Sequence, residues 1–97
     1  MLVKRLEREM DMLGRHLIVL RTVAREEPIG ILKLAEEVGF PKHKVRYSLR
    51  VLEHEGLIEP SPRGAITTKK ATKFIAQFES KMNPLEKKLS RVSKTLR

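Results

Sequence analysis

The chain has 97 residues and carries 21 Lys and Arg against 12 Asp and Glu, which gives a formal net charge of +9. It has no Cys, which excludes a disulfide framework, a thiol nucleophile and a Cys-based zinc site. No apolar run approaches the roughly 20 residues that span a bilayer, and charged residues interrupt any N-terminal signal segment. We therefore expect one cytoplasmic domain, whose charge favours a polyanionic partner.

The N-terminal segment predicts one long amphipathic helix over residues 2–25. Its apolar residues recur at alternating steps of three and four, which is the spacing of a heptad stripe: Val3, Leu6, Met10, Leu13, Leu17, Leu20 and Ala24. We expect the helix to end before Pro28, because the residue that precedes a proline avoids the helical region.

Two shorter helices are expected next. The first covers residues 29–38 and ends at Gly39, with four apolar residues available to the core: Leu32, Leu34, Ala35 and Val38. The second begins at Pro41, runs to about residue 55 and is closed by Gly56. One of its faces carries Val45, Ser48, Leu49 and Leu52.

A β-hairpin should follow. Residues 57–59 and 65–67 are short strand candidates, and the Pro-Ser-Pro-Arg-Gly sequence of residues 60–64 has the composition of a hairpin tip. A third short strand is expected near residues 28–31.

The last helical region begins with Thr67 or Thr68 as its N-cap. Its apolar stripe comprises Ala71, Ile75, Phe78, Met82, Leu85, Leu89, Val92 and Leu96. Asn83-Pro84 interrupts the stripe and predicts either one kinked helix or two helices in register. Residues 68–97 hold nine basic and two acidic side chains, so +7 of the +9 lies here. This charge indicates either nucleic-acid contact or a solvated face that aids solubility.

The segment from Ala35 to Phe74 resembles a known family. Ala35, Gly39 and Val45 have the spacing of helix-turn-helix units, in which a small residue, a turn glycine and a core-docking apolar residue follow each other. The pattern continues through Val45, Leu49, Leu52 and Gly56-Leu57-Ile58, and then through Ile66, Thr68, Ala71 and Phe74. Over about residues 15–80, the chain resembles winged helix-turn-helix transcriptional regulators, of the arsenic-repressor and multiple-antibiotic-resistance types found in bacteria and archaea. That family usually has Gly where this chain has Ala71.

The resemblance implies a mainly α fold with a small β-hairpin and long N- and C-terminal helices. It also implies a surface that binds double-stranded DNA. The second short helix would enter the major groove, and the hairpin tip would reach a phosphate or the minor groove. The residues implied are Lys42, His43, Lys44, Arg46, Tyr47 and Arg50 on the helix, Arg63 at the tip, and Thr67 and Thr68 as phosphate donors.

The two long apolar stripes exceed what a winged-helix core covers. An exposed stripe of this length seeks a partner, and a homodimer is the natural one. The interface would comprise Leu6, Met10, Leu13, Met82, Leu85, Leu89, Val92 and Leu96. We therefore expect a winged-helix domain over residues 1–82 and a dimerisation helix over residues 83–97. The alternative is that residues 84–97 fold back onto their own domain or fray.

The predicted function is a sequence-specific DNA-binding transcriptional regulator that acts as a homodimer. The alternatives are a winged-helix protein-interaction module, a non-specific basic protein that binds DNA or RNA through its C-terminal segment, and a basic helix on a membrane surface. We expect no enzyme and no cofactor, because the sequence lacks a nucleophile cluster and a phosphate loop. His16, His43 and His54 fit no common metal-ligand spacing, so we expect surface histidines and no metal. The sequence identifies no effector.

Overall fold

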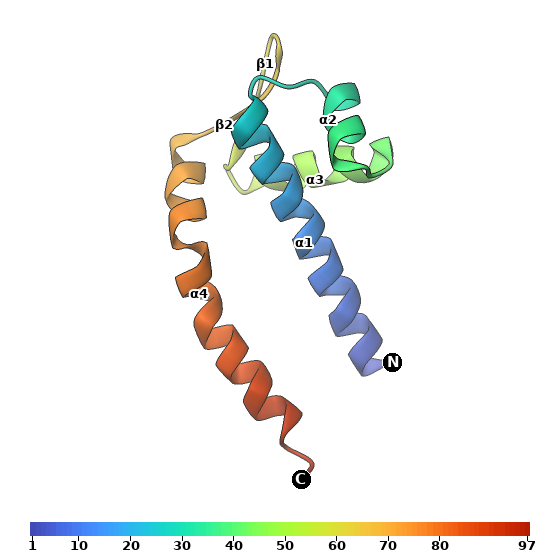
Figure 1. Ribbon diagram of the computed structural model, residues 1–97, viewed down its shortest axis with the longest axis vertical. Coiled ribbons are helices and arrows are strands. Elements are labelled where there is room, and N and C mark those ends of the chain that lie inside the picture. The colour runs from blue at the N-terminus through green and yellow to red at the C-terminus, as the bar shows by residue number, and fades with distance from the viewer.

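The computed structural model describes residues 1–97 as four helices and one two-stranded hairpin. In chain order these are α1 (Leu2–Glu26), α2 (Ile31–Val38), α3 (Lys42–His54), β1 (Ile58–Ser61), β2 (Gly64–Thr67) and α4 (Lys69–Ser93). The molecule is elongated, with extents of 55 × 28 × 20 Å. Figure 1 shows why: α2, α3 and the hairpin gather around one end of α1, while α1 and α4 continue beyond them toward both chain termini.

The hydrophobic core occupies only one end of the molecule. Its ten buried apolar residues come from every element except β2: Val19, Leu20, Val23, Ile29, Leu34, Val45, Leu52, Leu57, Ile58 and Ala71. On α1 burial begins at Val19, and on α4 it is limited to Ala71. The first half of α1 and the second half of α4 therefore carry apolar side chains that the core does not cover.

Helix α2 is shorter than the sequence predicts. It begins at Ile31, and Gly39 ends it with a φ of +76°, as the sequence predicts. The expectation that Leu32 faces inward is wrong, because this side chain is 69 % exposed. The inward face of this helix passes through Leu34, which is buried, and Val38 one turn later. Leu32 lies two residues before Leu34 and therefore points about 160° away from it around the helix axis.

The prediction of a short strand near residues 28–31 is confirmed as a single bridge. Ile29 donates its amide to the carbonyl of Ala65 at 3.2 Å and accepts the amide of Ala65 at 2.8 Å. This pairing takes Ile29 out of the helix that the sequence predicted from residue 29. In the hairpin, Ile58 pairs with Thr67 and Ser61 with Gly64. Both strands extend further toward the tip than predicted, which leaves only Pro62 and Arg63 there, and β1 begins at Ile58 instead of residue 57.

Helix α4 settles the alternatives at Asn83-Pro84 in favour of one continuous helix. Thr68 is its N-cap, with a hydroxyl that accepts the amide of Ala71 at 3.3 Å. Pro84 lies inside the helix and removes one main-chain donor. This stretch of α4 is exposed, so water can satisfy the freed carbonyl. The expected domain boundary at residue 82 therefore falls within an unbroken helix.

Candidate nucleic-acid interface

Helix α3 separates apolar from basic side chains. Val45, Ser48 and Leu52 are buried against the rest of the fold, which confirms the inner face that the sequence predicts. The opposite face is exposed and contains all six helix residues that the sequence assigned to DNA: Lys42, His43, Lys44, Arg46, Tyr47 and Arg50. Arg46 and Arg50 lie one turn apart on this face, so both guanidinium groups can reach the same side of a ligand.

The hairpin holds a further basic side chain away from the core. Arg63 is exposed at the two-residue tip. The hydroxyl of Ser61 closes the turn by donating to the carbonyl of Gly64 at 2.6 Å. The tip stands clear of the helices (Figure 1). An exposed arginine on a projecting tip of this kind suits a phosphate or a narrow minor groove.

Thr67 and Thr68 already have partners within the protein. The amide and hydroxyl of Thr67 both donate to the carboxylate of Glu27, at 2.8–3.0 Å. The Thr68 hydroxyl donates to the carbonyl of Gly56 at 2.7 Å. These bonds connect the ends of α1 and α3 to the start of α4. A phosphate would have to displace Glu27 in order to reach the Thr67 hydroxyl.

The expectation that all three histidines lie on the surface is wrong for His16. His43 and His54 are exposed at opposite ends of α3, but His16 on α1 is partly buried. Its Nδ1 shares a hydrogen bond with Ser48 Oγ at 2.7 Å, and its ring lies 5.7 Å from the ring of Tyr47. Burial, and then the positive charge of Arg15, lower the pKa of His16. The pair spans 32 residues, and no local sequence signal could have found it.

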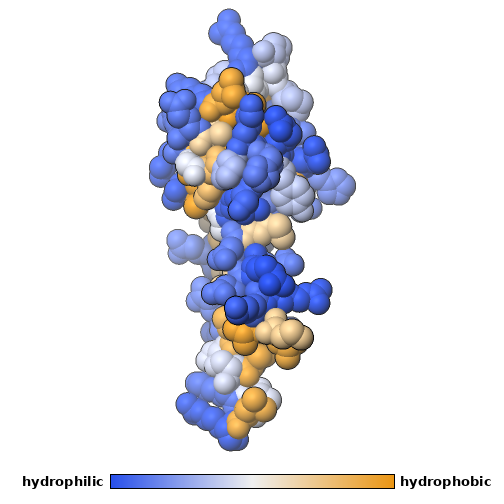
Figure 2. All heavy atoms as spheres, turned by 90° about the vertical axis from the view of Figure 1, so that its right-hand side faces the viewer, coloured by the Kyte–Doolittle hydropathy of each residue, from blue (hydrophilic) through white to orange (hydrophobic).

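The apolar stripes of α1 and α4 form the two walls of one open groove. Seven of the eight residues predicted for a dimer interface line it: Leu6, Met10, Leu13, Met82, Leu85, Leu89 and Val92. Leu96, the eighth, is almost fully exposed beyond its end. The groove volume is about 460 Å³, and its polar side chains are Glu86 and Lys88. Figure 2 shows apolar side chains at the surface of this half of the molecule.

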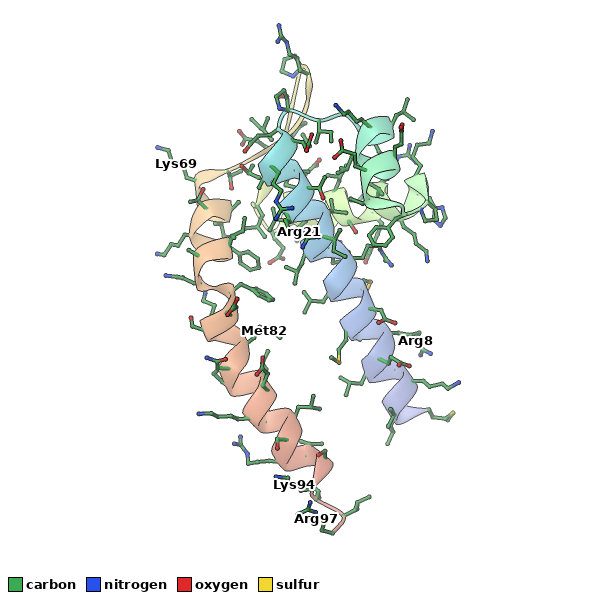
Figure 3. All side chains as sticks on the ribbon, viewed as in Figure 1. Arg8, Arg21, Lys69, Met82, Lys94 and Arg97 are labelled. Atoms are coloured by element: carbon green, nitrogen blue, oxygen red, sulfur yellow. The ribbon has the colours of Figure 1, made fainter.

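A second hollow lies between the same helices, closer to the core. Its volume is about 580 Å³. The apolar part of its lining comprises Leu17, Leu20 and Ala24 of α1 and Phe74, Ile75 and Phe78 of α4, and the charged part comprises Arg21, Arg25 and Glu79. Figure 3 shows two other charged side chains, Arg8 and Lys69, on the outer sides of α1 and α4. The space between the two helices is thus mainly apolar, and much of the charge lies outside it.

The comparisons with known proteins find a similarity to a domain of a transcription factor. No protein-family profile and no curated protein matches the chain. Among solved structures, the chain is similar to the activation domain of the phage T4 transcription factor MotA. The TM-score is 0.57 and the sequences are 28% identical over 70% of this chain and 76% of the phage chain. The chain thus has a mainly helical fold, with an antiparallel hairpin, that is similar to a transcription-factor domain. None of its helices has the length and hydropathy needed to cross a membrane.

Proposed function

We propose that this protein is a sequence-specific DNA-binding transcriptional regulator that acts as a homodimer. The observation that carries the proposal is the exposed face of α3, where four cationic side chains lie opposite the face that buries Val45, Ser48 and Leu52. The likeness to a transcription-factor domain supports a role in transcription. The hairpin adds Arg63 as a second basic projection, which is compatible with the wing of a winged helix.

The geometry of α3 fits the recognition of a DNA duplex. The major groove admits one α-helix, and an arginine binds the O6 and N7 of guanine with two hydrogen bonds. Arg46 and Arg50 are the residues that we assign to base edges or phosphates. Lys42 and Lys44, in the first turn of α3, are assigned to phosphates, which position the helix without reading sequence. Arg63 is assigned to the minor groove or its phosphates.

The groove between α1 and α4 is the surface that we assign to the homodimer. Leu85, Leu89 and Val92 are 54, 44 and 61 % exposed, and the groove places them opposite Leu6 and Met10. Burying such side chains against a second copy removes apolar surface from water. A two-fold dimer also presents two α3 helices to paired half-sites, which is how many regulators obtain specificity.

The DNA assignment is tested by fluorescence anisotropy with random duplex DNA across a salt series. The test variant is Arg46→Ala/Arg50→Ala. Lys81→Ala/Lys87→Ala is the matched control, because it removes the same charge from exposed positions of α4. If both arginines contact phosphate, the negative slope of log K against log salt should become shallower by roughly 2 in the test variant. If the arginines contact bases instead, the loss of each contact should weaken the binding free energy by about 1–3 kcal/mol.

The two double variants distinguish between the competing functions. Binding that weakens more in the α3 variant than in the α4 control supports the proposal and justifies selecting an operator. A larger loss in the control would support non-specific binding by the basic C-terminal segment. Binding that neither pair alters would sink the assignment of α3 to DNA.

Sedimentation equilibrium tests the homodimer. Leu89→Glu places a carboxylate inside the apolar groove, and Ser90→Glu places one on the exposed side of the same turn. We expect Leu89→Glu to be monomeric at concentrations where the wild type and Ser90→Glu are dimers, because a charge buried in an apolar interface is strongly unfavourable. Equal dimerisation of both variants would exclude the groove as the interface.

A second candidate function is a protein-interaction module. It is favoured by one observation, that the similar phage structure is the activation domain of its transcription factor. In that case the wild type would show no salt-dependent binding to duplex DNA, and α3 would contact another protein.

A further inference from the structure

His16 touches two consecutive residues of α3. On one side its Nδ1 is hydrogen-bonded to Ser48 Oγ at 2.7 Å. On the other side its ring lies 5.7 Å from the ring of Tyr47, at an interplanar angle of 45°. Ser48 points into the core and is 0 % exposed, whereas Tyr47 is 45 % exposed on the face assigned to DNA. One side chain of α1 therefore connects the buried face of α3 to its exposed face.

Two such contacts fix the rotation of α3 about its own axis. Neighbouring residues of an α-helix point about 100° apart. A rotation of α3 about its axis would therefore move Ser48 or Tyr47 away from His16 and break one of the two contacts. The buried Ser48 hydroxyl has His16 as its side-chain partner, and breaking that bond leaves a buried polar group unsatisfied. The apolar contacts of Val45 and Leu52 hold α3 on the core, but they tolerate small rotations because dispersion forces have little directionality.

The rotation of α3 determines where its arginines point. Arg46 and Arg50 lie on either side of the Tyr47–Ser48 pair in the sequence and share the exposed face. We propose that His16 is the positioning residue of this face: it holds α3 at the rotation that presents Tyr47, Arg46 and Arg50 together to one ligand. This inference rests on the proposed DNA-binding function. It assigns to α1, which also lines the groove, control over the geometry of α3.

Graded replacement of His16 tests the proposal. His16→Ala removes both contacts. His16→Asn keeps an amide at the position of Nδ1 and so retains a partner for Ser48, but it loses the ring. His54→Ala is the matched control, because it removes an exposed histidine from α3 itself. All variants are compared only where circular dichroism shows them fully folded.

Tyr47 provides a readout of the rotation of α3. It is the single tyrosine of a chain without tryptophan, so all intrinsic tyrosine emission comes from this ring. Acrylamide quenching of that emission reports how freely the ring is exposed. His16→Ala and His16→Asn both remove the ring beside Tyr47, so a difference in Tyr47 exposure between them reflects the bond to Ser48 and not the loss of the neighbouring ring. Anisotropy with random duplex DNA reports binding by the same samples.

We expect folded His16→Ala to bind DNA about tenfold more weakly, because α3 would then hold the binding rotation in only about a tenth of the molecules and the apparent affinity falls by that fraction. The DNA affinity of His16→Asn should lie between those of His16→Ala and the wild type, and the affinity of His54→Ala should equal that of the wild type. Quenching of Tyr47 should rise in both variants of His16, which lose the neighbouring ring, and it should rise more in His16→Ala than in His16→Asn. Folded His16→Ala with wild-type affinity, or with quenching no greater than that of His16→Asn, would overturn the proposal while the DNA-binding function stands. A wild type that does not bind DNA would overturn both.

Discussion

Replacing Gly64 with alanine should detach the hairpin from the start of α2. Gly64 has a φ of +132°, where side chains other than glycine are strained. A Cβ at this position would lie 2.5 Å from the carbonyl oxygen of Ile29 and 2.8 Å from the amide nitrogen of Gly30. Both are backbone atoms, so no flexible side chain can move aside. Relief requires the hairpin to shift away, which breaks the two hydrogen bonds between Ile29 and Ala65.

The size of the effect follows from these two terms. Backbone strain costs on the order of 1–3 kcal/mol, and two main-chain hydrogen bonds contribute about 0.5–1.5 kcal/mol each. We therefore expect Gly64→Ala to lower the free energy of unfolding by roughly 2–6 kcal/mol, the sum of the backbone strain that the substitution introduces and the two hydrogen bonds that it breaks. Urea denaturation followed by circular dichroism measures this change. DNA affinity should fall as well, because the tip that carries Arg63 moves.

The matched control is Gly14→Ala, which makes the same chemical change inside α1. A Cβ at Gly14 meets no atom within 4 Å. Alanine is favoured over glycine in a helix interior by about 1 kcal/mol, so this variant should be more stable than the wild type. If the two variants change stability in the same direction, or if Gly64→Ala is neutral, the hairpin does not pack against Ile29 as the structure shows.

Two further predictions concern α2 and His16. Leu34→Ala should lower the free energy of unfolding by about 2–5 kcal/mol, because its side chain is fully buried, whereas exposed Leu32→Ala should change it by less than about 0.5 kcal/mol. Equal urea midpoints would show that α2 packs through another face. Since the pKa of His16 in the folded protein lies below its usual 6.5, the unfolded chain takes up the proton first as the pH falls. Stability should therefore decrease below about pH 6.5 and level off below the folded-state pKa. His16→Asn should show a smaller decrease in urea titrations at pH 7.5 and 5.5, and an identical decrease would exclude His16 as the cause.

The sequence by itself determined the order and type of the helices and hairpin strands, but it left open whether Asn83-Pro84 divides the last helix. Local chemistry is sufficient for the order and type, because heptad spacing marks α1 and α4, Gly39 and Gly56 mark helix ends, and Pro-Gly punctuation marks the hairpin. It also determined which side chains of α3 are exposed, since burial of Val45 and Leu52 leaves the opposite face to solvent. The apolar residues that line the groove between α1 and α4 were found in the same way, by counting apolar positions that a small core cannot cover.

Only the tertiary structure decided how these elements meet. The hydrogen bond between His16 and Ser48 joins residues 32 apart in the sequence, and the bond between Glu27 and Thr67 joins residues 40 apart. Such pairs leave no periodic signal, because a polar side chain that is satisfied by a distant partner looks the same in the sequence as one that is solvated. The inward face of the short helix α2 was also set by its neighbours, which placed Leu32 in solvent. Periodicity reports which residues share a face, whereas packing alone decides what that face touches.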